Sequence, residues 1–212
     1  ENLSIINNIF ENYFIHGGAI YFKSEFHTDP FKNVYISSNI FKGEYISDEN
    51  YIPLIESEGG TKIYNLTITN HFFSNWSMPL NIGGNAVNNT FYRCKEVMGS
   101  GTNNIFRENT NIWIGGGKGW DVCNNIYENN SGIIRVEGTD FNLFNNTFKY
   151  NDIGLYIERD ERECKVFDNL FYRNSVGVRM VNAPNAEVYG NRFVENDIQA
   201  ESSSMCHRRY GE

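Results

Sequence analysis

The chain has 212 residues, of which 40% are apolar and 15% aromatic, and its formal net charge is −8. This length fits one domain with a sizeable core, and the negative charge argues against a general nucleic-acid or anionic-membrane binder, since both need a basic surface. No apolar run approaches the roughly 18 residues of a membrane-spanning helix, so no membrane span is predicted.

A short motif recurs along the chain: Asn, any residue, then Phe or Tyr. Successive copies lie 31, 31, 19, 15, 21, 21, 23 and 22 residues apart. The nine copies are Asn8-Ile9-Phe10, Asn39-Ile40-Phe41, Asn70-His71-Phe72, Asn89-Thr90-Phe91, Asn104-Ile105-Phe106, Asn125-Ile126-Tyr127, Asn146-Thr147-Phe148, Asn169-Leu170-Phe171 and Asn191-Arg192-Phe193. Six copies carry a second Asn five positions later: Asn75, Asn109, Asn130, Asn151, Asn174 and Asn196.

A period near 22 residues with two or three short strands is typical of one turn of a solenoid. Helical repeats are excluded because no stretch keeps a 3.6-residue apolar period, and a propeller blade needs roughly 40 residues. We therefore predict an all-β parallel solenoid of about nine coils of roughly 22 residues. Stacked Phe and Tyr rings should fill its interior. An inward Asn at each corner should take the left-handed conformation and bond its amide to the Asn above and below.

Three excursions interrupt the repeat, at residues 23–32, 43–53 and 159–163. Long excursions from a solenoid are where function usually lies. The first one contains His27 and Asp29, which we include as candidate substrate-binding residues. The alternative is that they are loop residues without a role.

The strand that follows each Gly should alternate inward and outward positions. This alternation predicts two outward columns that lie side by side on one face of the solenoid. The first column is Trp113, Arg135, Tyr156, Arg179 and Gln199, and the second is Glu137, Glu158, Val181 and Glu201.

This face is the candidate catalytic site. Glu137 and Glu158, on adjacent rungs, should lie about 5 Å apart, close enough to push their pKa values apart for acid–base work. Arg135 and Arg179 complete the catalytic candidates, because an Arg beside the carboxylates would neutralise an acidic sugar.

Trp113 and Tyr156 on the same face are candidate substrate-binding residues, since their rings could stack on a sugar. The alternative interpretation of the whole face is a surface patch of Glu–Arg pairs that hold neighbouring strands together.

A second face is unusually apolar. The outward position two residues before the motif Asn includes Ile68, Phe144, Phe167 and Tyr189. A stripe of this length would exceed the apolar area that a soluble monomer normally exposes, so we expect a second copy of the chain or a flanking domain to cover it. The alternative is a register error of one residue, which would place the stripe in the core.

The four cysteines are 29, 41 and 42 residues apart and contain no Cys-x-x-Cys, so no disulfide framework is predicted. No metal site and no cofactor are predicted. Calcium is left open, although no ligand cluster for it is visible. Met205-Cys206-His207 is a weak candidate for a soft metal such as copper(I). It lies in residues 201–212, expected to be a C-terminal cap or tail after a single domain at 1–200 that belongs to a longer chain.

The string Asn146-Thr147-Phe148-Lys149-Tyr150-Asn151-Asp152-Ile153-Gly154-Leu155 resembles the right-handed parallel β-helix repeats of pectate-lyase-like and NosD-like proteins. The resemblance covers the chain from about residue 3 to residue 200. It implies a secreted or cell-surface domain, or a periplasmic one, that binds polysaccharide. That superfamily includes polysaccharide lyases, glycoside hydrolases, phage tailspikes and a periplasmic copper-enzyme maturation factor.

Whether the chain is an enzyme stays open at this point. The Asp-Asp and Gly-His-Gly signatures of polygalacturonase-like enzymes are absent, and so is the clustered Asp of calcium-dependent lyases. If the chain is an enzyme, the resemblance implies a lyase or a glycoside hydrolase. The alternative function is a non-catalytic structural or oligomerisation segment of a surface protein or fibre.

Overall fold

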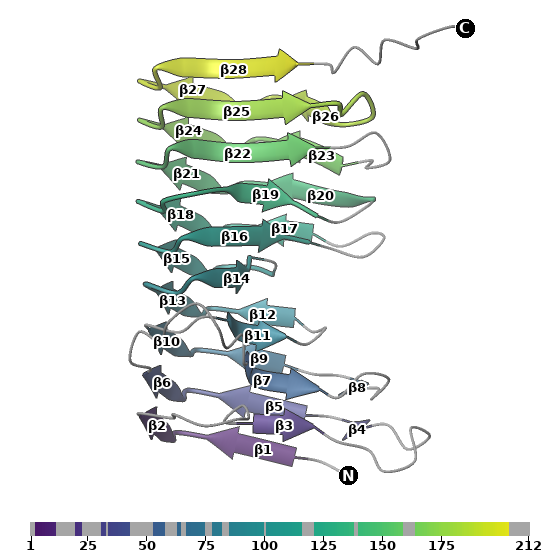
Figure 1. Cartoon of the computed structure of the whole chain (residues 1–212). Helices are drawn as coiled ribbons and strands as arrows, with labels where there is room; N and C mark the ends of the chain where they lie inside the picture. Colours follow the sequence, from purple (N-terminus) through teal and green to yellow (C-terminus); the bar gives the residue numbers. More distant parts are fainter. Residues whose placement is uncertain are drawn as a thin grey trace, which may run out of the picture.

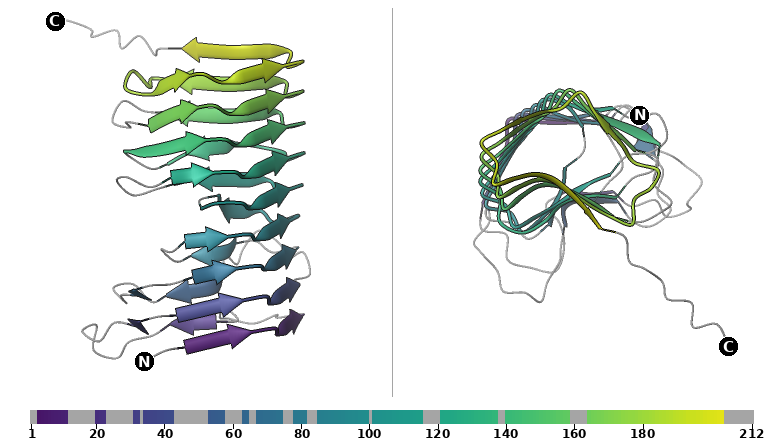
Figure 2. Two further views of the ribbon diagram at one scale, coloured as in Figure 1. Left: turned by 180° about the vertical axis from the view of Figure 1, so that it is seen from behind. Right: turned by 90° about the horizontal axis from the view of Figure 1, so that it is seen from above.

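Short parallel strands stack into coils around one axis in the computed structural model of the chain (Figures 1 and 2). The strand pairs are all parallel, and the described residues contain no helix. The structure describes residues 3–11, 20–22, 31–32, 34–42, 53–57, 63–64, 67–74, 78–81, 85–99, 101–115, 121–137, 140–158 and 164–203. A parallel β-helix is the architecture that the repeat predicts.

A nine-stranded sheet runs the length of the stack. Each of its strands begins directly after an Asn at a corner, or after His71 in one coil, and holds one inward aromatic ring. The strands are β2 (Ile9–Glu11), β6 (Ile40–Lys42), β10 (Phe72–Ser74), β13 (Thr90–Tyr92), β15 (Ile105–Arg107), β18 (Ile126–Glu128), β21 (Thr147–Lys149), β24 (Leu170–Tyr172) and β27 (Arg192–Val194).

Further sheets close the coils (Figure 2, right). A six-stranded sheet contains β14 (Glu96–Met98), β16 (Asn111–Ile114), β19 (Ile134–Val136), β22 (Ile153–Glu158), β25 (Val176–Val181) and β28 (Ile198–Ser203). Two four-stranded sheets contain β1 (Leu3–Ile6), β5 (Val34–Ser37), β9 (Thr67–Thr69) and β12 (Asn85–Val87), and then β17 (Asp121–Cys123), β20 (Phe141–Phe144), β23 (Cys164–Phe167) and β26 (Glu187–Tyr189). Smaller sheets contain β3 (Ile20–Phe22), β7 (Pro53–Ser57) and β11 (Met78–Asn81), and β4 (Phe31–Lys32) with β8 (Ile63–Tyr64).

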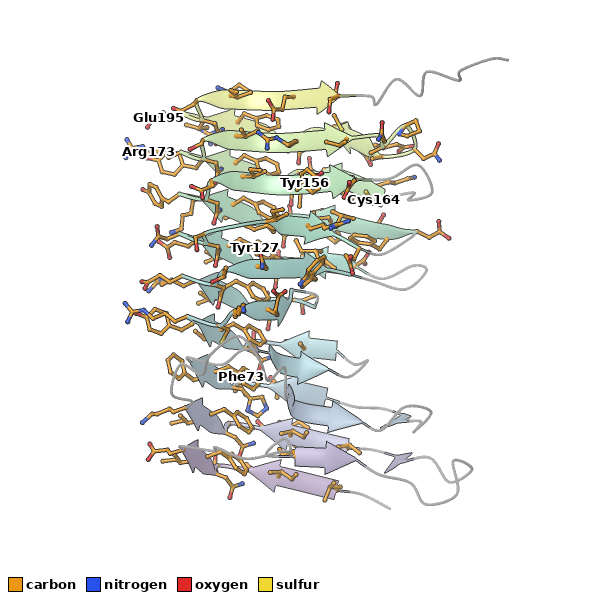
Figure 3. The ribbon with its side chains drawn as sticks, in the orientation of Figure 1. Phe73, Tyr127, Tyr156, Cys164, Arg173 and Glu195 are labelled. Carbon is orange, nitrogen blue, oxygen red and sulfur yellow. The ribbon has the colours of Figure 1, made fainter. Side chains whose placement is uncertain are left out.

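A column of stacked rings fills the interior beneath the nine-stranded sheet. Neighbouring rings are 4.6 to 5.0 Å apart and nearly parallel, which matches the spacing of adjacent strands. Tyr127, labelled in Figure 3, is one of these buried rings. The column is Phe10, Phe41, Phe73, Phe91, Phe106, Tyr127, Phe148, Phe171 and Phe193.

The predicted alignment of the third motif copy is wrong by one residue. Phe73 rather than Phe72 pairs with Phe41 and Phe91, and Phe73 is fully buried whereas Phe72 is 37% exposed. His71 therefore takes the place that the motif gives to Asn. A slip of one residue turns every side chain of a strand to the other face, so Phe72 points outward.

Fewer coils keep the 22-residue length than the predicted number of about nine. Ring partners from Phe106 to Phe193 lie 21, 21, 23 and 22 residues apart, so about five turns keep the spacing near 22. Earlier partners lie 31, 32, 18 and 15 residues apart.

Buried Asn side chains connect each coil to the next at one corner. The backbone N–H and the Nδ2 of Asn104 both donate to Asn125 Oδ1, at 2.8 and 3.1 Å, and Nδ2 also donates to Ala86 O. The same bonds recur at Asn125, Asn146 and Asn169. The predicted ladder of amides is confirmed.

The backbone of the ladder Asn is not left-handed, contrary to the prediction. The residue directly before it takes the positive φ instead, for example Asn103 at 58° and Asn124 at 58°. That exposed residue turns the chain, and the ladder Asn that follows points inward. Asp168 does the same at 53° before Asn169.

A second ladder of Asn side chains lies where the strands of the nine-stranded sheet end, opposite the corner at which they begin. Asn109, Asn130, Asn151 and Asn174 each donate to the next Asn Oδ1. Cys94 begins the ladder by donating its N–H to Asn109 Oδ1 at 2.8 Å. The two ladders fix the inward register of the strands between them, and so decide which side chains reach the surface. At the far end of the chain, β28 continues to Ser203, three residues past the predicted domain boundary at 200.

Candidate functional site

Most of the outward column predicted on the six-stranded sheet is present. Trp113 pairs with Arg135, Arg135 with Tyr156, and Tyr156 with Arg179. The four side chains alternate ring and guanidinium on four successive rungs. Tyr156 is labelled on β22 in Figure 3.

The predicted register of the last rung is wrong by two residues. Val178 pairs with Ala200, and Arg179 with Glu201 rather than Gln199. The prediction took the strand after each Gly as its reference, and Gln199 replaces the Gly in this coil. The second predicted column is affected too, because Glu158 pairs with Val181 and Val181 with Ser203. Glu201 therefore belongs to the first column.

Trp113 is held in place by a residue that the sequence did not suggest. Its Nε1 donates to Glu96 Oε2 at 2.5 Å, and Asn111 Nδ2 donates to the other oxygen of Glu96 at 3.0 Å. Glu96 lies on β14, in the coil before that of Trp113. It is the register partner of Asn111, only 15 residues further along the chain. Counting back from Asn109 to Cys94, its partner in the second ladder, would have aligned this strand.

Arg135 is the centre of the cluster. Its Nη2 lies 2.7 Å from Glu158 Oε2, its Nε lies 4.0 Å from Glu137 Oε1, and its guanidinium carbon lies 5.4 Å from the centre of the Trp113 ring. Its side chain is only 20% exposed. The buried Nε–H has no hydrogen-bond acceptor among the described residues. The structure thus brings together Trp113, Arg135, Glu137 and Glu158.

Arg179 forms a separate ion pair with Glu201, between Nε and Oε1. The two ion pairs each connect neighbouring strands, β19 with β22 and β25 with β28. Such cross-strand pairs are what the structural interpretation of this face predicts. They also occupy carboxylate oxygens that a general acid or base would have to present to a substrate.

His27 and Asp29 lie outside the described residues, and so do residues 43–52 and 159–163 of the other excursions. Their contribution to this face stays a prediction.

The apolar stripe is outward over three coils. The Phe144 and Phe167 rings stack 5.1 Å apart, and Phe167 and Tyr189 stack 5.3 Å apart. Tyr189 is 51% exposed. The register position of Ile68 differs from the prediction, since its strand partners are Ile36 and Ala86, two residues of the core.

Together these features define a parallel β-helix repeat protein that carries a polar, aromatic outer face. A family model described as periplasmic copper-binding protein (NosD) matches residues 49–209, about three quarters of the chain. The chain belongs to this right-handed β-helix family. The description agrees with the extracellular or periplasmic location that the repeats imply. No curated protein matches, and neither does any solved structure.

The copper in the family description raises the question of ligands in this chain. The described residues contain no group of three or more His, Cys, Asp or Glu side chains that could hold a metal ion. His71 and Cys94 are both buried in the ladders. The described part of the chain therefore does not fit a copper site, and Met205-Cys206-His207 lies outside it.

In the part of the chain that the structure describes, no helix has the length and apolarity needed to cross a membrane.

Proposed function

We propose that this surface β-helix domain binds a neutral polysaccharide along the outer face of the six-stranded sheet. The column of Trp113, Arg135, Tyr156 and Arg179 carries the proposal. Aromatic rings offer flat apolar area, and guanidinium groups offer several hydrogen-bond donors at fixed positions. A column that repeats at about 4.8 Å suits a long, repetitive ligand.

Pre-organisation supports binding at this column. The Trp113 indole is fixed by Glu96 on one edge and Arg135 near its ring, and Arg135 is fixed by Glu158. Side chains that are already ordered lose little conformational entropy when a ligand binds.

The charge on this face favours a neutral ligand over an acidic one. Both Arg side chains are already paired with Glu. Two arginines stand among four carboxylates, so the local charge is negative and a uronic-acid polymer would be repelled. The charged side chains of the face are Arg135, Arg179, Glu96, Glu137, Glu158 and Glu201.

Binding without cleavage follows from the same pairs. Glu158 uses Oε2 in its bond to Arg135, and Glu137 lies near the same guanidinium. We therefore expect no hydrolysis and no unsaturated product during incubation with polysaccharide.

The test is affinity electrophoresis in gels that contain glucan, galactan, mannan, polygalacturonate or alginate. Trp113→Ala should weaken binding to the retarding neutral polymer by about tenfold, the equivalent of about 1.4 kcal/mol. Tyr172→Ala is the matched control, because Arg173 covers its ring at 5.0 Å on a different sheet, and it should bind as wild type. Retardation only by the acidic polymers, or equal binding by Trp113→Ala, would contradict the proposal.

Assembly through the apolar stripe is a second candidate function. The observation in its favour is the outward stack of Phe144, Phe167 and Tyr189. A partner that covers the stack would remove apolar area from water. Sedimentation of wild type above the monomer mass, with a return to monomer in Tyr189→Ser, would support it; a monomeric wild type would oppose it.

Copper binding is a third candidate, and it comes from the family description alone. Its ligands would have to come from outside the described residues, and Met205, Cys206 and His207 are soft donors of the right kind. A copper(I) titration against a chromogenic chelator would test it. Cys206→Ser should lose the site whereas Cys94→Ser should keep it.

A further inference from the structure

A surface pocket of about 320 Å³ lies on the outer face of the nine-stranded sheet, across β10, β13 and β15. This volume is at the lower end of the range for small-molecule sites. The pocket is lined by Phe72, Thr90, Tyr92, Ile105, Arg107 and Glu108.

The pocket exists because a small side chain separates two large ones. Phe72, Thr90 and Ile105 are register partners on three successive strands, so Thr90 leaves room between the Phe72 ring and Ile105. Tyr92 closes one side, with its ring 6.4 Å from that of Phe72. The outward turn of Phe72, which follows from the His71 register, is what gives the pocket an aromatic wall.

The charges around the pocket balance. Arg107 pairs with Glu128 at 2.7 Å, and Arg93 pairs with Glu108 at 2.8 Å while its guanidinium carbon lies 4.8 Å from the centre of the Tyr92 ring. Of the pocket's own lining residues, Arg107 is positive and Glu108 negative, so the lining carries no net charge for an ionic ligand to neutralise. Their remaining donors and acceptors, with the Thr90 hydroxyl, can bond ligand hydroxyl groups.

We propose that this pocket is a second sugar-binding subsite that holds one neutral glycosyl unit against the Phe72 and Tyr92 rings. The inference rests on the proposed polysaccharide function and extends it to another sheet. The same two coils carry both places: Tyr92 and Glu96 lie in one coil, and Arg107 and Trp113 lie in the next. A polysaccharide that leaves the Trp113 column can therefore reach the pocket around one corner.

The experiment fills the pocket without touching the first face. Thr90→Leu places a larger side chain in the gap, and Phe72→Ala removes an exposed wall. Thr147→Leu is the matched control, because Thr147 occupies the same outward position, between Ile126 and Leu170, away from the pocket. Affinities are measured by calorimetry with the neutral oligosaccharides of two to six units that correspond to the polymer retarded in gels, and thermal unfolding checks that each variant folds.

We expect Thr90→Leu and Phe72→Ala each to weaken binding of the longer oligosaccharides by about tenfold, with Thr147→Leu unchanged. If both pocket variants bind as wild type while Trp113→Ala loses affinity, the pocket is not a subsite and the proposed function stands. If wild type binds no neutral saccharide, the proposed function fails and this inference fails with it. Should Phe72→Ala lose affinity and Trp113→Ala keep it, the pocket alone binds sugar.

Discussion

The imidazole Nδ1 of His71 accepts a hydrogen bond of 3.1 Å from the backbone N–H of Asn39. In the neighbouring coils an Asn carboxamide oxygen accepts this bond. The His71 Nε2 lies 3.0 Å from Ile36 O, which requires a proton on Nε2. The ring is thus the neutral tautomer with Nδ1 as acceptor.

Acid should destabilise the chain through His71. Burial lowers the pKa of His71, although its contacts with the Ile36 and Asn39 backbone act in the opposite direction. The folded state therefore resists protonation. The stability that His71 contributes is complete above the unfolded pKa of about 6.5 and is lost as the pH falls below it, by at most about 1.4 kcal/mol per pH unit.

Urea unfolding of wild type and His71→Asn between pH 8 and pH 5 measures this loss. The Asn variant restores the ladder residue, so its stability should fall less steeply in acid. Other titrating groups are common to both proteins and cancel in the difference. Parallel stability curves would contradict the prediction.

Tyr127→Phe should destabilise the chain by about 1–3 kcal/mol. The buried Tyr127 hydroxyl donates to Gly99 O at 2.7 Å, and the variant leaves that carbonyl without this donor while keeping the ring stack. Chemical unfolding measures the loss. Phe148→Tyr gives a contrasting case, because Phe148 has no hydroxyl and makes no such bond to a backbone carbonyl. Unchanged stability of Tyr127→Phe would show that the Gly99 carbonyl accepts a hydrogen bond from another donor.

Asn130→Ala should destabilise by several kcal/mol, because more than one buried polar group loses its partner. Asn130 Oδ1 accepts from the Asn109 backbone and side chain, and its Nδ2 donates to Phe106 O. Asn142→Ala removes only an exposed bond to Asp121 and should change stability by less than about 1 kcal/mol. Thermal unfolding of both variants tests the difference, and equal melting temperatures would refute the importance of the ladder.

Gly177→Ala should loosen β28. A Cβ at Gly177 would lie 2.3 Å from Gln199 O and 2.9 Å from a ring carbon of Phe193, so the strands must separate, at a cost of about 1–3 kcal/mol. Hydrogen exchange should accelerate for amides of β28 and remain slow in β19. Ser175→Ala, at an exposed position in the same coil, serves as control and should leave both strands protected.

The repeat predicted the solenoid because its two signals reinforce each other. A buried Asn and a buried ring recur together, and only stacked coils place both in columns. The third copy failed because Asn70-His71-Phe72 fits the motif, whereas the structure uses His71-Phe72-Phe73, in which His stands where the motif has Asn. The residue with positive φ decides between them: Asn70 has φ of 58° and precedes the ladder residue, as Asn88 does at 56°.

The candidate face could be predicted from alternation alone as far as Arg179. Glu96 was missed because its coil is short, and Glu201 was displaced because Gln199 stands where the earlier coils have Gly. Side-chain pairing is a different matter. The sequence places Arg135 near Glu137 and Glu158, but only the folded geometry shows that one guanidinium serves both carboxylates.

The amide ladders also bear on the response of the chain to mechanical force. Asn130 is typical of the ladders in bonding to the coil below it and to the coil above it, so tension along the axis would load one such junction after another. A coil of roughly 22 residues would lengthen to about 75 Å when it opens. When the chain is pulled in an optical trap, the end-to-end length of the regular part from β15 to β27 would increase in discrete steps of similar size.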